Sequence, residues 1–340
     1  MPRKENLLRI LYIHNLNQAA RTFGKELARR GHTVTIYEPS LKGGSAPLLL
    51  KLAMMPERIL DLRRVIGRLS SSYCDLVHIH WASYGVLGLV CRVPYVVHCH
   101  GSDIRYRLQR PVFRTALTFI LRRAALVLCS TPDLLPVIQE VRPDAVFFPG
   151  PIDTERFAPG AGGNEPARPW TILLFARLDV IKGCEIAVQG IARFVERHPE
   201  VHVKLLDWGT ETQKYRRRYR ERFEFVPFVT PELVQQLICT ADVVVGQVFL
   251  GAIGLAELQA MSCARPVIAL FRYEDAYPEP PPVCRAATAQ EVDQHLEDLF
   301  QHPEAAVELG QRARRWVIDY HSHQDVATKL ERLYQSILSR

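Results

Sequence analysis

The stretch GAIGLAELQAMSCARPVI at residues 251–268 organises the interpretation of the whole chain. Gly251 and Gly254 allow the backbone to approach a ligand closely, and the apolar residues from 255 to 261 recur with the period of a helix. Arg265 and Pro266 end this helix before a short buried strand. A helix that begins at the carboxyl end of a parallel strand directs backbone N–H groups outward. The stretch therefore predicts an anion-binding site.

Length and composition indicate an ordinary globular protein of about two domains. The chain has 340 residues, of which 48% are hydrophobic and 23% are charged, and this is enough for two separate cores. Arginines interrupt the longest apolar runs at Arg92 and Arg122, so no run is long enough to cross a bilayer. The first residues lead directly into a predicted strand, without the zones of a signal peptide. We therefore expect a cytoplasmic protein.

Eight cysteines are scattered through the predicted strands and helices, and the sequence contains no Cys-x-x-Cys pair. This spacing suits neither a zinc site nor a disulfide framework. The cysteines are best explained as small buried apolar residues in a reducing compartment.

Strand and helix patterns alternate along the first half of the chain. Strands are predicted at 7–14, 33–38, 75–80, 95–100, 126–130 and 145–148, with helices at 18–30, 111–124 and after the N-cap Thr131. Strands that are almost continuously apolar and alternate with helices predict a parallel, doubly wound sheet. The loop at 15–18 lacks the glycines of a dinucleotide-binding fold, which argues against a Rossmann dehydrogenase.

The alternation starts again after a Gly- and Pro-rich stretch at 160–169, which we interpret as a linker. A capping box at Thr288 opens the first of the C-terminal helices. The predicted organisation is an N-terminal Rossmann-like domain at 1–159, the linker at 160–169, a C-terminal Rossmann-like domain at 170–320 and a C-terminal helix at 321–340 that packs back toward the first domain. Two such α/β domains are expected to face each other across a cleft.

Six motifs occur in order along the chain: Gly31–Val34, Asp75–Trp81, His98–Arg105, Gly150–Phe157, Ala176–Leu178 with Lys182–Glu185, and Gly254–Leu255 with Met261–Val267. With these motifs the chain resembles the family 4 glycosyltransferases of GT-B fold. Each motif is weak alone, but together they are specific and extend over nearly the whole chain. The resemblance implies a retaining, metal-independent transfer of a sugar from a nucleotide-diphosphate sugar to a glycan or lipid-linked acceptor.

In this interpretation the second domain binds the donor. Arg177 ends a strand and Lys182 precedes a helix, so two fixed cations could converge on a diphosphate near the amides that open the helix at 255. A metal is then not needed, and no cofactor is expected. The predicted donor-binding residues are Arg177, Lys182, Gln247, Ala252, Ile253, Gly254, Leu255 and Gln259.

The chain departs from the resembled family at two glutamates, whose positions fall on Gly251 and Gln259. Gln259 can still hydrogen-bond a ribose hydroxyl, and Gln247 is expected to take the sugar hydroxyls in place of the first glutamate. Glu257 points to a different face of the helix and is a poor substitute. The missing carboxylates leave two alternatives open: a non-catalytic nucleotide-sugar or glycan binding protein, and a sugar epimerase of GT-B architecture.

The first domain contributes the motif His100–Asp103 at the end of a strand. In the resembled family the matching histidine lies beside the transferred sugar, so His100 and Asp103 are the predicted catalytic residues. The candidates for the acceptor side are Asn17, Gln18, His80 and Trp81.

Two His-x-His repeats, His78 with His80 and His98 with His100, place pairs of imidazoles on the same face of a strand, as a metal site would require. No carboxylate or cysteine at ligand spacing completes such a site. Buried strand histidines usually find backbone partners instead. We therefore expect no metal.

Basic residues are concentrated in the first half of the chain. Residues 1–156 contain 22 Lys and Arg against 12 Asp and Glu, a net charge of +10, and the remainder carries −3. This asymmetry predicts either contact with an anionic partner, such as a membrane surface, or a solvated basic face. The candidate cations for a membrane are Arg58, Arg63, Arg64, Arg68, Arg105, Arg107, Arg110 and Arg114.

A second cationic run, Lys214–Arg222, contains aromatic residues as a nucleic-acid site would. It lies on a predicted amphipathic helix in the acidic half of the chain, without any accompanying nucleic-acid-binding motif. A solvated helix face explains it, and we expect no nucleic-acid partner.

Overall fold

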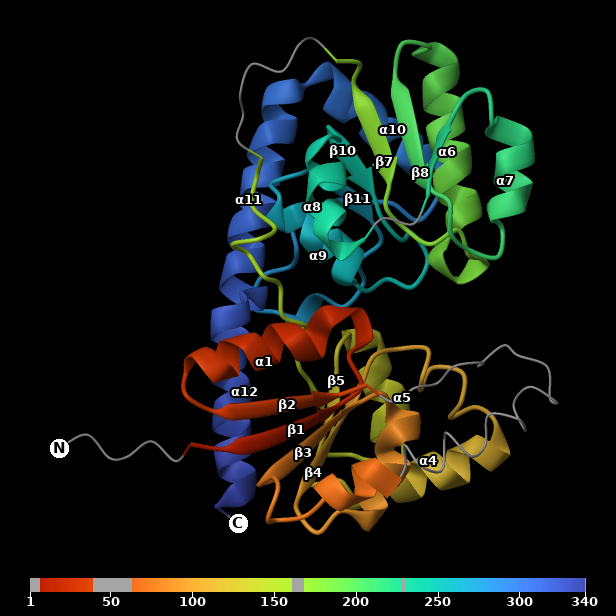
Figure 1. The fold of residues 1–340 in the computed structure, drawn as a ribbon. Helices are drawn as coiled ribbons and strands as arrows, with labels where there is room; N and C mark the ends of the chain where they lie inside the picture. Colours follow the sequence, from red (N-terminus) through yellow and green to blue (C-terminus); the bar gives the residue numbers. More distant parts are fainter. Residues whose placement is uncertain (1–6, 39–62, 161–167, 228–229, 340) are drawn as a thin grey trace. The chain divides into compact units, whose positions relative to one another are not determined.

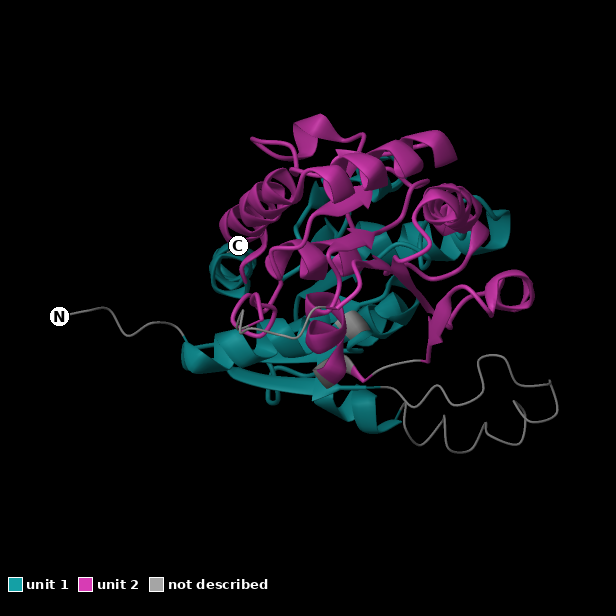
Figure 2. Ribbon diagram, turned by 90° about the horizontal axis from the view of Figure 1, so that it is seen from above, with its two compact units in different colours: residues 1–151, 323–340 teal, residues 152–322 magenta. Residues whose placement is uncertain are grey.

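The computed structural model describes residues 7–38, 63–160, 168–227 and 230–339. The chain forms two compact units, the first from residues 1–151 and 323–340 and the second from residues 152–322 (Figure 2). Within the described residues, each unit contains a six-stranded parallel sheet with helices packed on it (Figure 1). The predicted class, α/β with two Rossmann-like doubly wound domains, is confirmed.

The sheet of the first unit has the strand order β2-β1-β3-β4-β5-β6, and its neighbouring strands are parallel. Its strands are β1 (Arg9–Ile13), β2 (Thr33–Tyr37), β3 (Leu76–His80), β4 (Tyr95–Cys99), β5 (Leu126–Cys129) and β6 (Val146–Phe147). The chain passes from β1 outward to β2 and then to β3 on the opposite side of β1. The strand order therefore reverses between β1 and β3. Ligands of open parallel sheets bind at such switch points, beyond the carboxyl ends of the strands.

The first unit includes the C-terminal helix. The helices that the structure describes in this unit include α1 (Ala19–Arg29), α4 (Pro111–Arg123), α5 (Leu135–Gln139), α12 (His323–Leu338) and a segment at 63–68, with the 3₁₀ turns η1 (Leu16–Gln18), η2 (Ala82–Val90) and η3 (Pro132–Leu134). The helix α12 packs against α1 (Figure 1). The hydroxyl of Tyr334 in α12 lies 3.1 Å from that of Tyr12 in β1. This helix therefore covers one face of the first sheet.

Successive side chains of β3 point to opposite faces of the first sheet, and both faces are buried. Val77 and Ile79 belong to the core that includes α4. Leu76 belongs to the opposite core, which includes α1 and α12. His78 and His80 share the face of Leu76, because residues two apart on a strand point the same way. Burial on both faces explains why the strands are almost continuously apolar.

The sheet of the second unit has the order β12-β11-β10-β7-β8-β9 and is also parallel. Its strands are β7 (Thr171–Leu174), β8 (His202–Leu206), β9 (Glu224–Val226), β10 (Val243–Val245), β11 (Val267–Ala269) and β12 (Cys284–Arg285). Because β8 and β9 lie on one side of β7 and β10 on the other, the switch point of this sheet lies between β7 and β10.

The helices of the second unit follow the predicted order. They are α6 (Cys184–Arg197), α7 (Thr212–Tyr219), α8 (Pro231–Cys239), α9 (Leu255–Ser262), α10 (Ala289–Gln301) and α11 (Pro303–His321), with the 3₁₀ turns η4 (Val180–Lys182) and η5 (Glu274–Ala276). The helix α9 and the start of the strand β11 lie in the 251–268 stretch, as the sequence indicated. The predicted capping box also forms, since the Thr288 hydroxyl accepts the Glu291 N–H at 3.2 Å.

The boundary between the units lies at residues 151 and 152, whereas the sequence placed the end of the first domain at 159. The N–H of Ile152 donates to the carbonyl of His321 at 2.8 Å. Arg314 donates to the carbonyl of Phe157 at 3.0 Å. These bonds attach the segment 152–160 to the second unit. Most of the predicted linker, residues 161–167, lies outside the described residues.

Candidate functional site

The loops after β7 and β10 form the switch-point edge of the second sheet. The two strands pair directly, so the loops that leave their carboxyl ends are neighbours. The N–H of Val248, after β10, donates to the carbonyl of Lys182 at 3.1 Å. This edge therefore gathers Arg177, Lys182 and the beginning of α9, as the sequence predicted.

Glu257 fixes the beginning of α9 against the end of β10. Its side chain is buried, and its carboxylate accepts the N–H of Gln247 at 2.7 Å and that of Gly254 at 3.0 Å. A Cβ at position 246 would lie 2.5 Å from the Glu257 side chain, so only glycine fits there. The carboxylate satisfies N–H groups that the start of a helix leaves unpaired. Glu257 therefore has a structural role.

Two groups that were predicted to contact the donor are engaged within the protein. Gln247 is 1% exposed. Its carboxamide donates to the carbonyl of Ala252 and accepts the N–H of Leu250 at 2.8 Å. The amide of Gly254 donates to Glu257. We therefore correct both assignments: Gln247 shapes the loop instead of binding sugar hydroxyls, and the Gly254 amide caps the helix instead of binding phosphate.

The remaining predicted donor residues differ in exposure. Ala252 and Ile253 are buried, whereas Leu255 and Gln259 are partly exposed on α9. Gly251 has a φ of +76°, and a Cβ there would meet the Arg272 side chain at 3.2 Å. A glutamate at position 251 would be strained in this conformation. The local backbone therefore favours glycine at position 251.

Arg177 is a partly exposed cation of this edge that the protein holds in place. Its guanidinium forms an ion pair with Asp179 and lies over the ring of Trp208, 5.6 Å from the centroid. Asp179 also accepts the N–H of Thr210 at 2.7 Å, which anchors the pair to the loop after β8. A guanidinium has five N–H donors in a rigid fork. Arg177 can therefore keep its contact with Asp179 and still bind an anion.

In the first unit, Asp103 connects the loops after β3 and β4. Its carboxylate is fully buried and accepts the N–H groups of Ala82 at 2.8 Å, His100 at 3.1 Å and Gly101 at 2.8 Å. Burial raises the pKa of the Asp103 carboxyl, and the amide bonds oppose this shift. We therefore correct the predicted catalytic role of Asp103, because a buried acceptor of three amides positions His100 and does not reach a substrate.

His100 is partly exposed at the carboxyl end of β4, and His80 lies buried behind it. The Nδ1 of His80 is 3.0 Å from the Nε2 of His100. Burial, with a smaller contribution from His14, lowers the pKa of His100 to about 3, so its ring is neutral at neutral pH. A neutral imidazole can donate one hydrogen bond and accept another. His80 is fully buried and orients His100, which corrects its predicted place on the acceptor side.

Strained backbone marks the switch-point edge of the first sheet. Of the described non-glycine residues with positive φ, three lie here: His14 at 71°, Gln18 at 65° and Trp81 at 123°. Such strain persists mainly at functional positions. Gln18 and Trp81 are partly exposed, as an acceptor-side role requires, while the side chain of Asn17 lies outside the described residues.

Sequence reasoning missed His14, whose ring lies 6.3 Å from that of Trp81. The position of His14 directly after β1, at the switch point between β1 and β3, could have indicated a place in the site.

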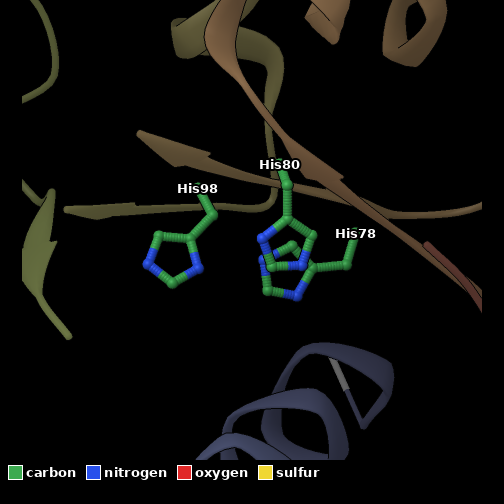
Figure 3. A group of neighbouring side chains, drawn as sticks. All are labelled: His78, His80 and His98. Carbon is green, nitrogen blue, oxygen red and sulfur yellow. The ribbon is translucent and has the colours of Figure 1, made fainter. Parts of the chain in front are cut away.

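Three buried histidines of β3 and β4 each have at least one ring nitrogen without a hydrogen-bond partner in the described part of the chain, and Figure 3 shows the three rings side by side. They are His78, His80 and His98, all fully buried. The Nε2 atoms of His78 and His80 and both ring nitrogens of His98 have no partner. The expectation that backbone groups would satisfy these rings is wrong, because the strands use their backbone groups for pairing with each other.

Two family models match the chain in the order of its two units. Glycosyltransferase Family 4 matches residues 16–156, and Glycosyl transferases group 1 matches residues 169–279. Together they span most of the chain. The chain is a family 4 glycosyltransferase. No curated protein matches the transferase by sequence.

Solved glycosyltransferase structures share the fold of this transferase. The Anabaena protein HepE in complex with UDP and glucose is 15% identical with a TM-score of 0.71, covering 97% of this chain and 100% of its own. Sucrose-phosphate synthase from Thermosynechococcus elongatus is 17% identical with a TM-score of 0.74, covering 97% and 99%. The catalytic domain of starch synthase IV from Arabidopsis thaliana, bound to ADP and acarbose, is 13% identical with a TM-score of 0.67, covering 98% and 100%.

We expect Glu257→Gln to destabilise the transferase through its effect on the loop before α9. Glutamine offers only one acceptor oxygen and would turn an NH₂ group toward a backbone N–H that donates in the wild type. The loss of a buried charge-assisted bond should lower the free energy of unfolding by about 2 kcal/mol, as measured by urea denaturation.

The matched control is Glu308→Gln, the same change at an exposed position of α11. Its stability should stay close to that of the wild type. Equal stabilities for the two variants would show that Glu257 does not hold the loop.

Proposed function

We propose that the transferase moves a sugar from a nucleotide-diphosphate sugar to a glycan or lipid-linked acceptor, with retention and without a metal at the donor diphosphate. The observation that carries this proposal is the pair of cations, Arg177 and Lys182, at the switch-point edge of the second unit. The similar structures of HepE with UDP and of starch synthase IV with ADP support a nucleoside diphosphate as the leaving group.

The two cations, more than the N-terminus of α9, stabilise the diphosphate in this proposal. Glu257 already accepts the amides of Gln247 and Gly254, and its negative charge opposes the positive end of the helix dipole. Arg177 offers a planar fork of donors and Lys182 a compact charge. Arg177 is held in place by Asp179 and Trp208, and together with Lys182 it stabilises the negative charge that develops as the sugar bond breaks.

Gln259 is the proposed ribose contact. It lies on the partly exposed side of α9, whereas Glu257 lies on the buried side. Its carboxamide can accept one ribose hydroxyl and donate to another. A neutral amide forms a weaker bond than the carboxylate of the resembled family, so we expect modest nucleotide affinity.

His100 is the proposed contact with the transferred sugar in the first unit. Its neutral ring accepts or donates at Nε2 toward His80, which leaves the opposite ring nitrogen for a hydroxyl of the substrate. Asp103 fixes the backbone of His100 through the loop amide. The first unit thereby holds one imidazole in a defined orientation.

Calorimetry with UDP, GDP and ADP tests the donor site. We expect at least one of them to bind the wild type, and Arg177→Ala to weaken that binding about tenfold or more, because a charge-assisted bond contributes about 1.5–3 kcal/mol. Gln259→Glu should tighten binding by about 1 kcal/mol, since a carboxylate accepts a ribose hydroxyl more strongly.

The control for this experiment is Arg217→Ala, which removes an exposed arginine of α7 in the same unit. It should bind like the wild type. The proposal is contradicted if none of the three nucleotides binds, or if the Arg177→Ala variant binds a nucleotide as tightly as the wild type does. Incubation with a bound donor separates the alternatives. Transfer or slow hydrolysis of the donor supports a glycosyltransferase, and an altered sugar still attached to its nucleotide supports an epimerase. Saturable binding without turnover supports a protein that only binds.

We further propose that the transferase is cytoplasmic and contacts anionic membrane through α4. Within the described residues, no helix is both long enough and apolar enough to cross a bilayer, so contact would be peripheral. Val112, Phe113 and Phe119 of α4 are exposed by 83%, 44% and 51%. Arg123 lies over the ring of Phe119, 4.7 Å from its centroid. Exposed apolar side chains beside arginines are typical of a helix that lies in a membrane interface.

The structure changes the set of cations available for such a surface. Arg105 pairs with the buried carboxylate of Asp133 through a bond of 3.0 Å from Nε and a second from Nη2, so it is engaged inside the unit. Arg114 pairs with Glu140. Arg58 lies outside the described residues, whereas Arg63, Arg64 and Arg68 lie on a described helical segment at 63–68.

Sedimentation with vesicles tests the membrane proposal. The transferase should bind anionic vesicles more than neutral ones, and high salt should weaken binding, because each cation near such a surface contributes about 1 kcal/mol. The variant Phe119→Ser should bind anionic vesicles less than the wild type. The control variant Val307→Ser, at a similarly exposed position of α11, should bind them as well as the wild type. Equal binding to both kinds of vesicle would exclude the proposal.

A further inference from the structure

Three imidazoles converge in the core of the first unit. His80 and His98 are direct neighbours across the β3–β4 pair, and His78 is two residues before His80 on the same face (Figure 3). The ring centroids are 4.3 Å apart for His78 and His80, and 5.4 Å apart for each of the other two pairs. One nitrogen of each ring lies within 4.8 Å of the other two.

The unpartnered nitrogens are the unusual feature of this cluster. Each ring has at least one nitrogen without a hydrogen-bond partner in the described part of the chain. Buried polar atoms are nearly always satisfied, and leaving one unsatisfied destabilises the folded state. Three such rings side by side in an aromatic core that includes Tyr12, Phe23 and Phe148 call for a shared ligand.

The other ring nitrogens of two of these histidines are held in place. The Nδ1 of His78 is hydrogen-bonded to the hydroxyl of Tyr334, and the Nδ1 of His80 is 3.0 Å from the Nε2 of His100. Metal-binding histidines commonly donate their second ring nitrogen in this way, which fixes the ring and leaves the lone pair for the metal. With protons on both Nδ1 atoms, the Nε2 atoms of His78 and His80 carry the lone pairs.

We propose that His78, His80 and His98 bind a divalent transition-metal ion, Zn²⁺ by preference, as a structural centre of the first unit. Three neutral imidazoles suit Zn²⁺ and Co²⁺, whereas Mg²⁺ and Ca²⁺ require oxygen ligands. Zn–N bonds of about 2.0–2.1 Å place tetrahedral ligand atoms about 3.4 Å apart, so the ring nitrogens must approach one another by up to roughly 1.4 Å. The rings of His78 and His80 are stacked with an interplanar angle of 7°, so these side chains must also rotate for both lone pairs to point at one ion. The fourth position is left for a water molecule.

This ion would act on the core of the first unit and not on the donor diphosphate. It would join β3 to β4 and, through Tyr334, to α12. It would also keep the proton of His80 on Nδ1, so that His100 accepts at Nε2. Because all three ligands are fully buried, we expect the ion to enter during folding and to leave slowly.

Elemental analysis of the native full chain tests the proposal. The chain is made without a histidine tag in cells grown with added zinc, or with cobalt in a parallel culture. We expect about one ion per chain, and for the cobalt form the visible absorption of tetrahedral Co²⁺ with nitrogen ligands. A wild-type chain that folds without a stoichiometric ion in both cultures overturns the proposal, whatever the variants show.

The variant His98→Leu separates a metal ligand from an unsatisfied buried side chain. If the ion is present, His98→Leu loses it and melts at a lower temperature than the wild type. If there is no ion, leucine replaces an unpartnered imidazole by an apolar group, and the melting temperature stays or rises. The latter result, or unchanged metal content, contradicts the proposal.

The control is His32→Gln, which removes a buried histidine of the same unit outside the cluster. The ring of His32 bonds to the N–H of Leu8 at 3.1 Å and to Glu331 at 3.0 Å. This variant should lose stability but keep its ion. Loss of the ion from His32→Gln as well would show that metal content only reports damage to the fold.

Discussion

A buried carboxylate that accepts backbone N–H groups holds the switch-point edge of each sheet. In the first unit Asp103 accepts the amides of Ala82, His100 and Gly101, which connects the loops after β3 and β4. In the second unit Glu257 accepts amides from the end of β10 and from the beginning of α9. Loops at the ends of parallel strands have no ladder partners of their own. In each sheet a buried carboxylate accepts the N–H groups of these loops in place of a neighbouring strand, and this holds the loops in position.

These internal bonds determine which residues remain for a ligand. The amide of Gly254 and the side chain of Gln247 are engaged within the second unit. Arg177 and Gln259 stay partly exposed at the same edge. In the first unit His100 is partly exposed, together with Gln18 and Trp81, and its ring is oriented by the buried His80. The exposed side chains proposed to bind substrate are thus positioned by buried acidic residues that bond to backbone amides.

The fold was predictable from the sequence, because apolar strands and amphipathic helices have different periods and both sheets are parallel. The candidate site was predictable only in part. Arg177 follows directly from its place at a strand end. The engagement of Gln247, Asp103 and Glu257 was not predictable, since it depends on which side chain reaches which amide across a loop. The clustering of His78 with His98 depends on strand register, which a single sequence does not specify.

A crystal structure of the transferase with the nucleoside diphosphate that binds most tightly tests the central claim most directly. The account predicts the diphosphate within hydrogen-bond distance of the Arg177 guanidinium and the Lys182 ammonium, the ribose at Gln259, and Glu257 still bonded to the amides of Gln247 and Gly254. A ribose bound by Glu257, or a nucleotide bound away from this edge of the second sheet, would contradict it.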